Sequence, residues 1–213
     1  GDNFLGGEDF TEVLYQLFLK RRGLEEETLS LKTRLYLKKQ AELCKLGFSE
    51  ERSSVMRCVM DGEEWEETFK ISEYEEACAP LFEKIRKPVK RSLSDAGIRL
   101  SQIDEVVLVG GATKLPIVRQ FISRLFRRVP DTHINPDEAV ALGAAIQAAM
   151  KDRNDAIREV ILTDVCSFTL GTEVAVKERI SGQYESGHFC PIIERNTVIP
   201  ASRTERFYTI YDD

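Results

Sequence analysis

The 213-residue sequence has few of the features on which small secreted or metal-binding proteins depend. Its five cysteines are odd in number and no two have the CxxC spacing, so we expect neither a disulfide framework nor a zinc site. We interpret them as free thiols in a reducing compartment. The two histidines, His133 and His188, belong to no Ser/His/Asp or metal-spaced pattern, so neither is predicted to be catalytic.

Long apolar runs and an excess of positive charge are also missing. The longest apolar run lies within residues 139–150, which is shorter than the roughly 18 residues that a membrane-spanning helix needs. No signal peptide is recognisable. The 36 acidic residues outnumber the 30 basic ones, giving a net charge of -6, whereas nucleic-acid binders are usually basic. We therefore predict no membrane span, no nucleic-acid partner and a cytoplasmic location.

What the sequence does contain is the composition of an ordinary globular protein, with 42% hydrophobic and 31% charged residues. Its length allows one or two domains. The chain begins at Gly1 and ends at Asp213 within a strand-like run, so we expect a fragment of a longer protein. The predicted fold class is mixed α/β (α+β), because helical periodicity alternates with strand-like runs before residue 157 and β-like runs follow it.

Helices are predicted at 8–22 and 25–47, since apolar residues recur there at helical spacing and a glycine follows or ends each segment. The Asp61-Gly62 pair between two strand-like runs predicts a β-hairpin. Residues 61–76 hold eight Asp or Glu and a single base. This acidic stretch is either a solvated face or a surface for a basic partner.

A third helix is predicted from Ser72 toward Ala96. Ser72 and Glu75 have the spacing of a capping box, with Ser72 as the N-cap. Pro80 and Pro88 should kink or break this helix, because proline removes a backbone donor.

A buried strand is predicted at 105–109, followed by a helix at 116–127 and another from Pro136 to about Asp152. The small residues of the last helix imply that it packs closely. Beyond it, FTLGTEVAV, FCPIIERNT and RFYTIY read as β runs. We place a domain boundary at 157–164.

Two motifs are candidates for ligand binding. In VVLVGGATKLP, a strand leads into Gly110 and Gly111, which lack side chains and so let a ligand approach the backbone. The same pattern also fits an ordinary tight turn. Asn135-Pro-Asp137-Glu138 precedes a helix, and there the simplest interpretation is helix capping.

Glu42, Lys45 and Ser49 form a third pattern. Glu42 and Lys45 share one face of a helix, and by spacing alone a surface ion pair is the simpler interpretation. The alternative is that they offer an acceptor and a donor to the hydroxyls of a sugar, with Ser49 reaching a base.

These pieces occur together and in order in one family. The chain resembles the DnaK-type 70-kDa heat-shock chaperones in five motifs that cover nearly its whole length: GDNFLGGEDF, SQIDEVVLVGGATKLPIVRQFI, INPDEAVALGAAIQAA, VILTDVCSFTLGTEV and IIERNTVIPASRTERFYTIYDD. Within the family, GDNFLGGEDFT, ILTDVC and PIIERNT look most like the HscC branch.

The resemblance implies an actin-like ATPase lobe, lobe II of the nucleotide-binding domain, at 1–156. Its larger subdomain would comprise 1–12 and 87–156, and its smaller subdomain 13–86. An interdomain linker would follow at 157–164. Residues 165–213 would be the opening strands of a β-sandwich that binds peptides.

The resemblance also implies a nucleotide site for ATP or ADP, with Mg²⁺ in the full-length protein. Glu42 and Lys45 would bond the ribose and Ser49 would face the adenine. The remaining nucleotide contacts would come from Gly110, Gly111, Lys114 and Asp137. Three departures from the family pattern weaken this expectation: Ala112 replaces Ser, Lys114 replaces an Arg that stacks on adenine, and Leu46 replaces a basic residue.

In the β segment, the resemblance places Thr172 and Phe207 in the peptide pocket and Ala175 and Ile210 at the arch above it. Thr172 replaces a larger aliphatic residue, so the pocket should be less apolar. The linker residues implied are Val160, Ile161, Leu162 and Asp164.

The implied function is that of an ATP-dependent chaperone that binds unfolded peptide segments, with a J-domain co-chaperone and a nucleotide exchange factor as partners. Because phosphoryl transfer needs several positioned groups together, we expect this chain alone not to hydrolyse ATP. A degenerate, non-catalytic interaction module is the alternative. An actin-like sugar kinase fits less well, because VILTD is followed by a β segment.

Overall fold

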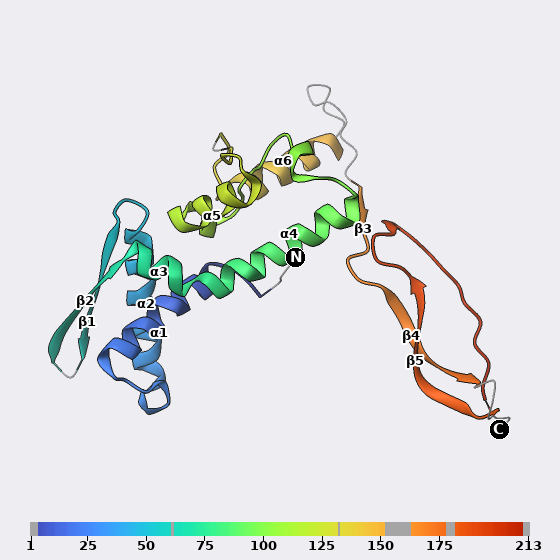
Figure 1. Cartoon of the computed structure of the whole chain (residues 1–213), viewed down its shortest axis with the longest axis horizontal. Helices are drawn as coiled ribbons and strands as arrows, with labels where there is room; N and C mark the ends of the chain where they lie inside the picture. The colour runs from blue at the N-terminus through green and yellow to red at the C-terminus, as the bar shows by residue number, and fades with distance from the viewer. Residues whose placement is uncertain (1–3, 61, 132, 152–162, 178–181, 211–213) are drawn as a thin grey trace. The chain divides into compact units, whose positions relative to one another are not determined.

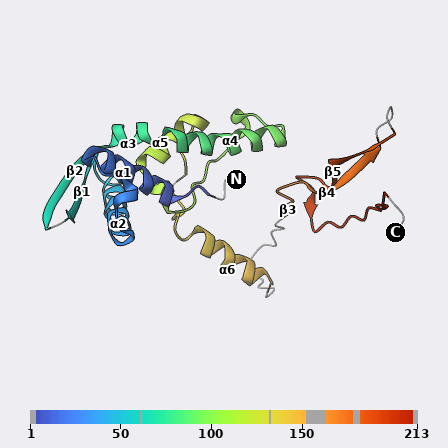
Figure 2. The same ribbon diagram turned by 90° about the horizontal axis from the view of Figure 1, so that it is seen from below.

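The computed structural model describes residues 4–60, 62–131, 133–151, 163–177 and 182–210. It divides into two compact units, unit 1 (Gly1–Ala149) and unit 2 (Met150–Asp213), which are described separately (Figures 1 and 2). The mixed α and β fold class is confirmed, since helices and small antiparallel strand pairs both occur.

Unit 1 contains most of the elements. In chain order they are α1 (Gly7–Arg22), η1 (Glu26–Thr28), α2 (Leu31–Gly47), β1 (Ser53–Met60), β2 (Glu63–Lys70), α3 (Ile71–Ala77), α4 (Ala79–Ala96), η2 (Leu100–Gln102), η3 (Gly111–Lys114), α5 (Pro116–Phe126) and α6 (Ala139–Lys151), where η marks a 3₁₀ helix. The last helix crosses into unit 2.

The first two helices follow the predicted pattern with one shift. α1 ends at Gly23, which takes the left-handed φ of 64° that favours glycine at this position. α2 begins later than predicted, because the Ser30 hydroxyl accepts the Thr33 N–H at 3.1 Å and caps the helix there. The predicted hairpin is confirmed, with β1 antiparallel to β2 from Ser53↔Lys70 to Met60↔Glu63.

The helix predicted from Ser72 is divided in two. α3 begins at Ile71 with Lys70 as its N-cap, so the prediction that Ser72 is the cap is wrong. β2 ends immediately before α3, which leaves no room for a separate capping loop. The predicted break occurs at Cys78, between α3 and α4 and just before Pro80, whereas Pro88 lies inside the continuous α4.

The strand predicted at 105–109 is not formed. In the described residues this segment makes a single parallel bridge, Val107 to Asp131, and Val106 is its buried residue. A strand needs a neighbouring ladder to satisfy its backbone groups, and one bridge does not provide it. The prediction for Pro136 is also wrong, since residues 136–138 form a turn and α6 begins at Ala139.

The hydrophobic core of unit 1 is formed by α1, α2, the hairpin, α3, the start of α4 and α5. Phe48 stacks on Tyr74 with ring centroids 5.0 Å apart, and the Tyr74 hydroxyl donates to the Phe10 carbonyl at 2.8 Å. A second stack, Phe82 on Phe121 at 4.7 Å, joins α4 to α5. These aromatic contacts hold the end of α2 against α3, and α4 against α5.

α6 does not pack as its small residues predicted. None of its side chains is buried in the described structure, and Val140 is 73% exposed. The small residues of α6 would allow another element to pack closely against this helix, but they do not determine whether one does.

Unit 2 is formed by short antiparallel pairs. β4 (Leu170–Lys177) pairs with β5 (Tyr184–Ile193), and β3 (Asp164–Val165) pairs with β6 (Val198–Ile199). The β prediction is correct for FTLGTEVAV and FCPIIERNT. It is wrong for RFYTIY, since residues 201–210 contain no strand; no partner strand is paired with that segment in the described structure.

Candidate functional site

The two glycines of VVLVGGATKLP form a tight turn. Gly110 has a φ of 92°, and its carbonyl accepts both the Thr113 N–H at 3.0 Å and the Thr113 hydroxyl at 2.7 Å. The next four residues form η3, and α5 follows from Pro116. Thr113 thus closes the turn with two hydrogen bonds to the Gly110 carbonyl.

The turn at 135–138 lies directly against this glycine turn. The Gly110 N–H donates to the Pro136 carbonyl at 2.9 Å, and Lys114 pairs with Asp137. A Cβ on Gly111 would lie 3.5 Å from Asp137 Oδ1. The structure therefore brings together two motifs, 106–116 and 135–138, that are separate in the sequence.

The turn at 135–138 is organised by Asn135. Its Oδ1 accepts the Asp137 N–H at 3.1 Å, and its Nδ2 donates to Glu138 Oε1 at 2.9 Å. Asp137 is not used as a helix cap in these contacts, and its carboxylate points toward Lys114. Capping alone therefore does not account for the arrangement of this motif.

Lys45 and Glu42 do not form the ion pair that their spacing allows. Lys45 is only 7% exposed, and its ammonium donates to the Gly7 carbonyl at 3.0 Å and to Thr11 Oγ1 at 2.8 Å. Glu42 is exposed on the same helix. The surface ion pair interpretation is wrong because Lys45 is directed inward, toward the start of α1.

Ser49 is exposed and lines a cavity of about 440 Å³. The cavity lies between the loop after α2, the start of α3 and the start of α5, and its lining includes Phe48, Arg52, Pro116 and Gln120. Pro116 follows Lys114 by two residues. Ser49 and the end of the glycine turn are therefore near neighbours in the fold.

α1 connects these parts, since it contacts both α2 and η3. Lys45 bonds to the start of α1, and the glycine turn lies against the same helix. The partners of Lys45, Gly7 and Thr11, were not predicted from the sequence. The sequence signal that could have indicated them is the spacing of four residues between Gly7 and Thr11, which places both on one face of α1.

The three departures from the family pattern have different surroundings. Lys114 is about half exposed and its ammonium is paired with Asp137. Leu46 is exposed on α2, and Ala112 lies in η3. None of the three positions offers a planar guanidinium to a ligand.

The predicted peptide-binding residues lie on separate segments of unit 2. Thr172 pairs with Cys190 in the β4–β5 ladder, and Ala175 lies at the irregularity between Val174 and Val176. Phe207 and Ile210 lie in the segment after Pro200 that has no strand. That these four side chains form a peptide pocket stays a prediction.

Of the predicted linker residues, Asp164 begins β3 and pairs with Ile199. Val160, Ile161 and Leu162 lie outside the described residues. Within the described part of the chain, no helix is long and apolar enough to span a membrane, and no cluster of three metal-ligating side chains occurs.

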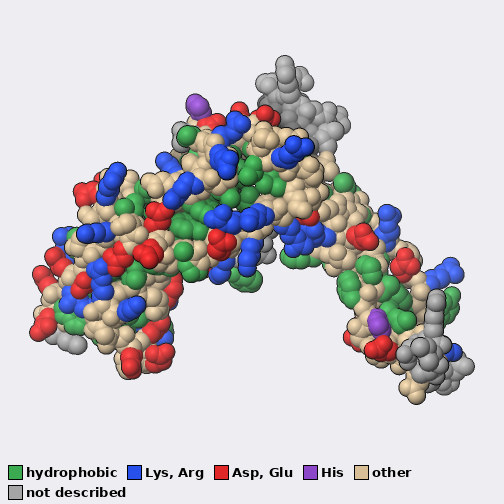
Figure 3. Space-filling model, in the orientation of Figure 1, with side chains coloured by type: hydrophobic (Ala, Val, Ile, Leu, Met, Phe, Trp, Pro, Cys, Tyr) green, Lys and Arg blue, Asp and Glu red, His purple; other side chains and the backbone are tan. Residues whose placement is uncertain are grey.

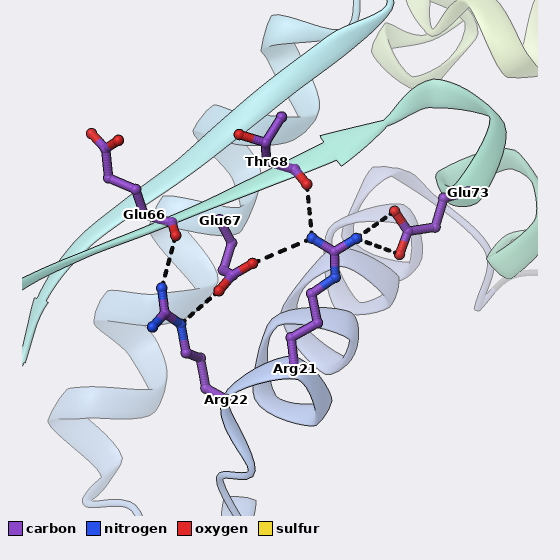
Figure 4. A network of polar contacts seen from close by, with 6 residues as sticks. All are labelled: Arg21, Arg22, Glu66, Glu67, Thr68 and Glu73. Atoms are coloured by element: carbon purple, nitrogen blue, oxygen red, sulfur yellow. Dashed lines mark hydrogen bonds and ion pairs between the residues drawn. The ribbon is translucent and has the colours of Figure 1, made fainter.

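Two carboxylates of the acidic stretch, Glu67 and Glu73, are paired with arginines at the end of α1 (Figure 4). Arg21 donates to both oxygens of Glu73 at 2.6 and 2.7 Å and to the Thr68 carbonyl at 2.7 Å. Arg22 pairs with Glu67 at 2.8 Å. Figure 3 shows red and blue side chains interspersed over this end of unit 1, which favours a solvated, internally paired face over a surface for a basic partner.

Comparison with known proteins identifies the chain. A family model described as "Hsp70 protein" matches residues 1–213. The chain belongs to the Hsp70 family. It is 35% identical over 220 aligned residues to a "Chaperone protein DnaK" of Deinococcus deserti, an alignment that covers 98% of this chain and 33% of that relative.

The predicted DnaK-type family is therefore confirmed, and the helices and hairpins of this Hsp70 chain are consistent with an ATPase-domain fragment of mixed α and β structure. The Hsp70 chain spans about a third of the length of the relative that it matches. Its resemblance to the HscC branch stays a prediction.

Proposed function

We propose that this chain supplies the adenosine-binding side of the nucleotide site in an ATP-dependent chaperone. Family membership supports the class of function. The observation that carries the site is the junction of the two turns, made by the Gly110–Pro136 hydrogen bond and the Lys114–Asp137 ion pair.

The residues present suit ATP or ADP. The backbone of Gly110 and Gly111 carries no side chains, so a nucleotide can approach it closely. The Lys45 ammonium has three N–H donors, two of which are used by Gly7 and Thr11, which leaves one for a ribose hydroxyl.

The remaining roles follow the family pattern. Glu42 would accept from the ribose, Ser49 would face the adenine from its cavity wall, and Asp137 would hold Lys114 at the edge of the site. The lobe, subdomain and linker boundaries at 1–156, 13–86 and 157–164 belong to this proposal.

Calorimetric titration of the chain with ADP tests the proposed site. Gly111→Val should weaken ADP binding at least tenfold, because the new side chain covers the backbone that the nucleotide approaches. Asp137→Asn should also weaken it, since Lys114 loses its partner. Gly6→Ala is the matched control, because nothing lies within 4 Å of a Cβ at that position. Equal affinity in all four proteins would refute the proposed site.

We further propose that the chain alone binds nucleotide without hydrolysing it. Its matched motifs belong to the adenosine side, whereas phosphoryl transfer depends on several groups placed around the γ-phosphate. Phosphate release from ATP should stay at the buffer rate. Turnover that is lost on Asp137→Asn would contradict this expectation.

In the full-length protein, nucleotide binding would control the binding of unfolded peptides, as a coupling between two sites. Leu162→Asp in the linker should abolish the stimulation of ATPase activity by peptide while leaving basal turnover unchanged. Stimulation equal to that of the wild type would show that Leu162 takes no part. J-domain and nucleotide exchange partners belong to the same proposal.

A non-catalytic interaction module is the second candidate. It is favoured by exposed Leu46 where the family pattern has a basic residue, and by Lys114, which lacks the planar guanidinium of the usual Arg. The ADP titration separates the two candidates, since the module predicts no nucleotide affinity in the full-length protein either.

A further inference from the structure

The start of α1 holds a buried cation in an unusual setting. The Lys45 ammonium lies 3.6 Å from where a Cβ on Gly7 would be, at the first residue of the helix. A helix N-terminus carries a partial positive charge and therefore disfavours a nearby cation. Within the described part of the chain no carboxylate forms an ion pair with Lys45, whose hydrogen bonds are to neutral oxygens.

In the described residues, the acidic side chains of this turn form no ion pair with the ammonium. Glu8 and Asp9 occupy the first turn of α1, but Asp9 accepts the Gly6 N–H at 2.8 Å. Removing a cation from water without a partner charge is costly. A local arrangement that works against stability is expected at functional sites rather than at structural ones.

Thr11 determines where this ammonium lies. Its side chain belongs to a residue that is only 3% exposed, and its hydroxyl donates to the Gly7 carbonyl at 3.2 Å. A hydroxyl has one donor and two acceptor positions. With its proton directed to Gly7, the oxygen offers a lone pair to Lys45 Nζ at 2.8 Å.

We propose that Thr11 is a positioning residue that, with the Gly7 carbonyl, holds the Lys45 ammonium in place so that its third N–H is ready for a ligand hydroxyl. The proposal rests on the nucleotide site proposed above and assigns it a residue outside the predicted set. Thr11 itself does not touch the ligand. Its effect is to remove the cost of ordering a flexible lysine when the ligand binds.

Amine labelling tests the hold of Thr11 on Lys45 without any ligand. The 213-residue chain is treated with a water-soluble acetylating reagent, and the rate at Lys45 is read by peptide mass spectrometry. Thr11→Val keeps the shape of the side chain but removes the hydroxyl, so labelling should become about tenfold faster, as expected for a lost hydrogen bond to a charged group. Thr11→Ser should restore the slow rate.

Thr28→Val is the matched control. Its hydroxyl also donates to a backbone carbonyl, that of Glu25 at 2.7 Å, but on an exposed turn. It should leave labelling of Lys45 within twofold of the wild type. Circular dichroism verifies that each variant folds, and Thr11→Ala takes the place of the valine variant if that one does not. Unchanged labelling in the folded variant overturns the proposal.

ADP titration of the same proteins tests the ligand side. Thr11→Val should bind about tenfold more weakly and Thr11→Ser about as well as the wild type. In a Lys45→Met background the valine substitution should have no further effect, because Thr11 acts only through the Lys45 amine, which methionine lacks. Wild-type affinity in Thr11→Val overturns the positioning role. Absence of ADP binding by the wild-type chain instead overturns the proposed nucleotide function, while the labelling result still decides whether Thr11 holds Lys45.

Discussion

Tyr74 and Cys78 lie side by side in the core of unit 1, and both are fully buried. Burial raises the pKa of the Tyr74 hydroxyl well above its usual range, and the neighbouring Cys78 contributes in the same direction. Burial also raises the pKa of the Cys78 thiol to about 12, from an ordinary value of 9.0. The pKa of Tyr15 is raised to about 12 by burial and by nearby Glu26. All three groups remain neutral in the folded chain at pH values where the unfolded chain ionises them.

These shifts predict a loss of stability in alkali. Each folded-state pKa lies above its unfolded value, so the contribution is complete below pH 9 and is lost as pH rises toward 12. Per group, the free energy of unfolding should fall by up to about 1.4 kcal/mol per pH unit in that window. Urea unfolding at pH 7 to 10.5 measures it.

In the variant Cys78→Ala, the free energy of unfolding should fall less steeply above about pH 9 than in the wild type. Cys166→Ala is the control, because Cys166 is only half-buried, in unit 2. A decline of equal slope in the wild type and in Cys78→Ala would show that another group is responsible.

Among the elements, the β1–β2 hairpin depends on α1 for its position. Arg21 reaches from the last turn of α1 to Thr68 on β2 and Glu73 on α3, and its guanidinium lies 4.4 Å from the centre of the Phe69 ring. One planar side chain therefore joins three elements by charge-assisted hydrogen bonds and a cation–π contact.

Arg21→Ala should lower the free energy of unfolding by about 1.5–3 kcal/mol, the range for hydrogen bonds to charged groups. Arg21→Lys should recover part of the loss, because an ammonium keeps the charge but not the fork of donors. Arg57→Ala is the matched control, since its pair with Glu66 joins the same hairpin but is exposed, and it should change stability by less than about 1 kcal/mol. Equal losses in Arg21→Ala and Arg57→Ala, measured by urea unfolding, would contradict this role.

For the whole molecule, the distribution of buried residues differs between the two units. Every buried hydrophobic residue of the described structure lies between Phe10 and Pro130, within unit 1. Unit 2 has paired strands but no buried side chain among its described residues. Since burial of apolar surface is the main stabilising contribution, unit 1 should hold nearly all of the chain's stability.

Residues 1–149 expressed alone should therefore unfold at a urea midpoint close to that of the whole chain. Residues 150–213 alone should show no cooperative transition, because isolated hairpins are at best marginally stable in water. Denaturation followed by tryptophan fluorescence and circular dichroism gives both results, with Trp65 as the probe in unit 1. A markedly lower midpoint for 1–149 would show that unit 2 contributes to stability.

Local sequence patterns predicted most elements because their signals are local. Gly23 ends α1, Asp61-Gly62 marks the hairpin, and Pro80 marks the break before α4, each through the backbone preferences of a few residues. The helix starts predicted at Ser72 and Pro136 were wrong by a few residues, and two larger errors arose where a distant neighbour was needed. Among the described residues, VVLV at 106–109 has the composition of a strand but one bridge to Asp131. In the same part of the chain, α6 has the composition of a packed helix but no buried residue.

In the candidate site, too, local sequence patterns and long-range contacts determined different features. The sequence by itself determined the family, through five ordered motifs, and it pointed to Gly110, Lys45 and Asp137. Only the tertiary structure decided that Lys45 turns inward to Gly7 and Thr11 and that Asp137 meets Lys114. Motifs depend on residue types along the chain, whereas the partner of a side chain depends on which elements the hydrophobic core packs together.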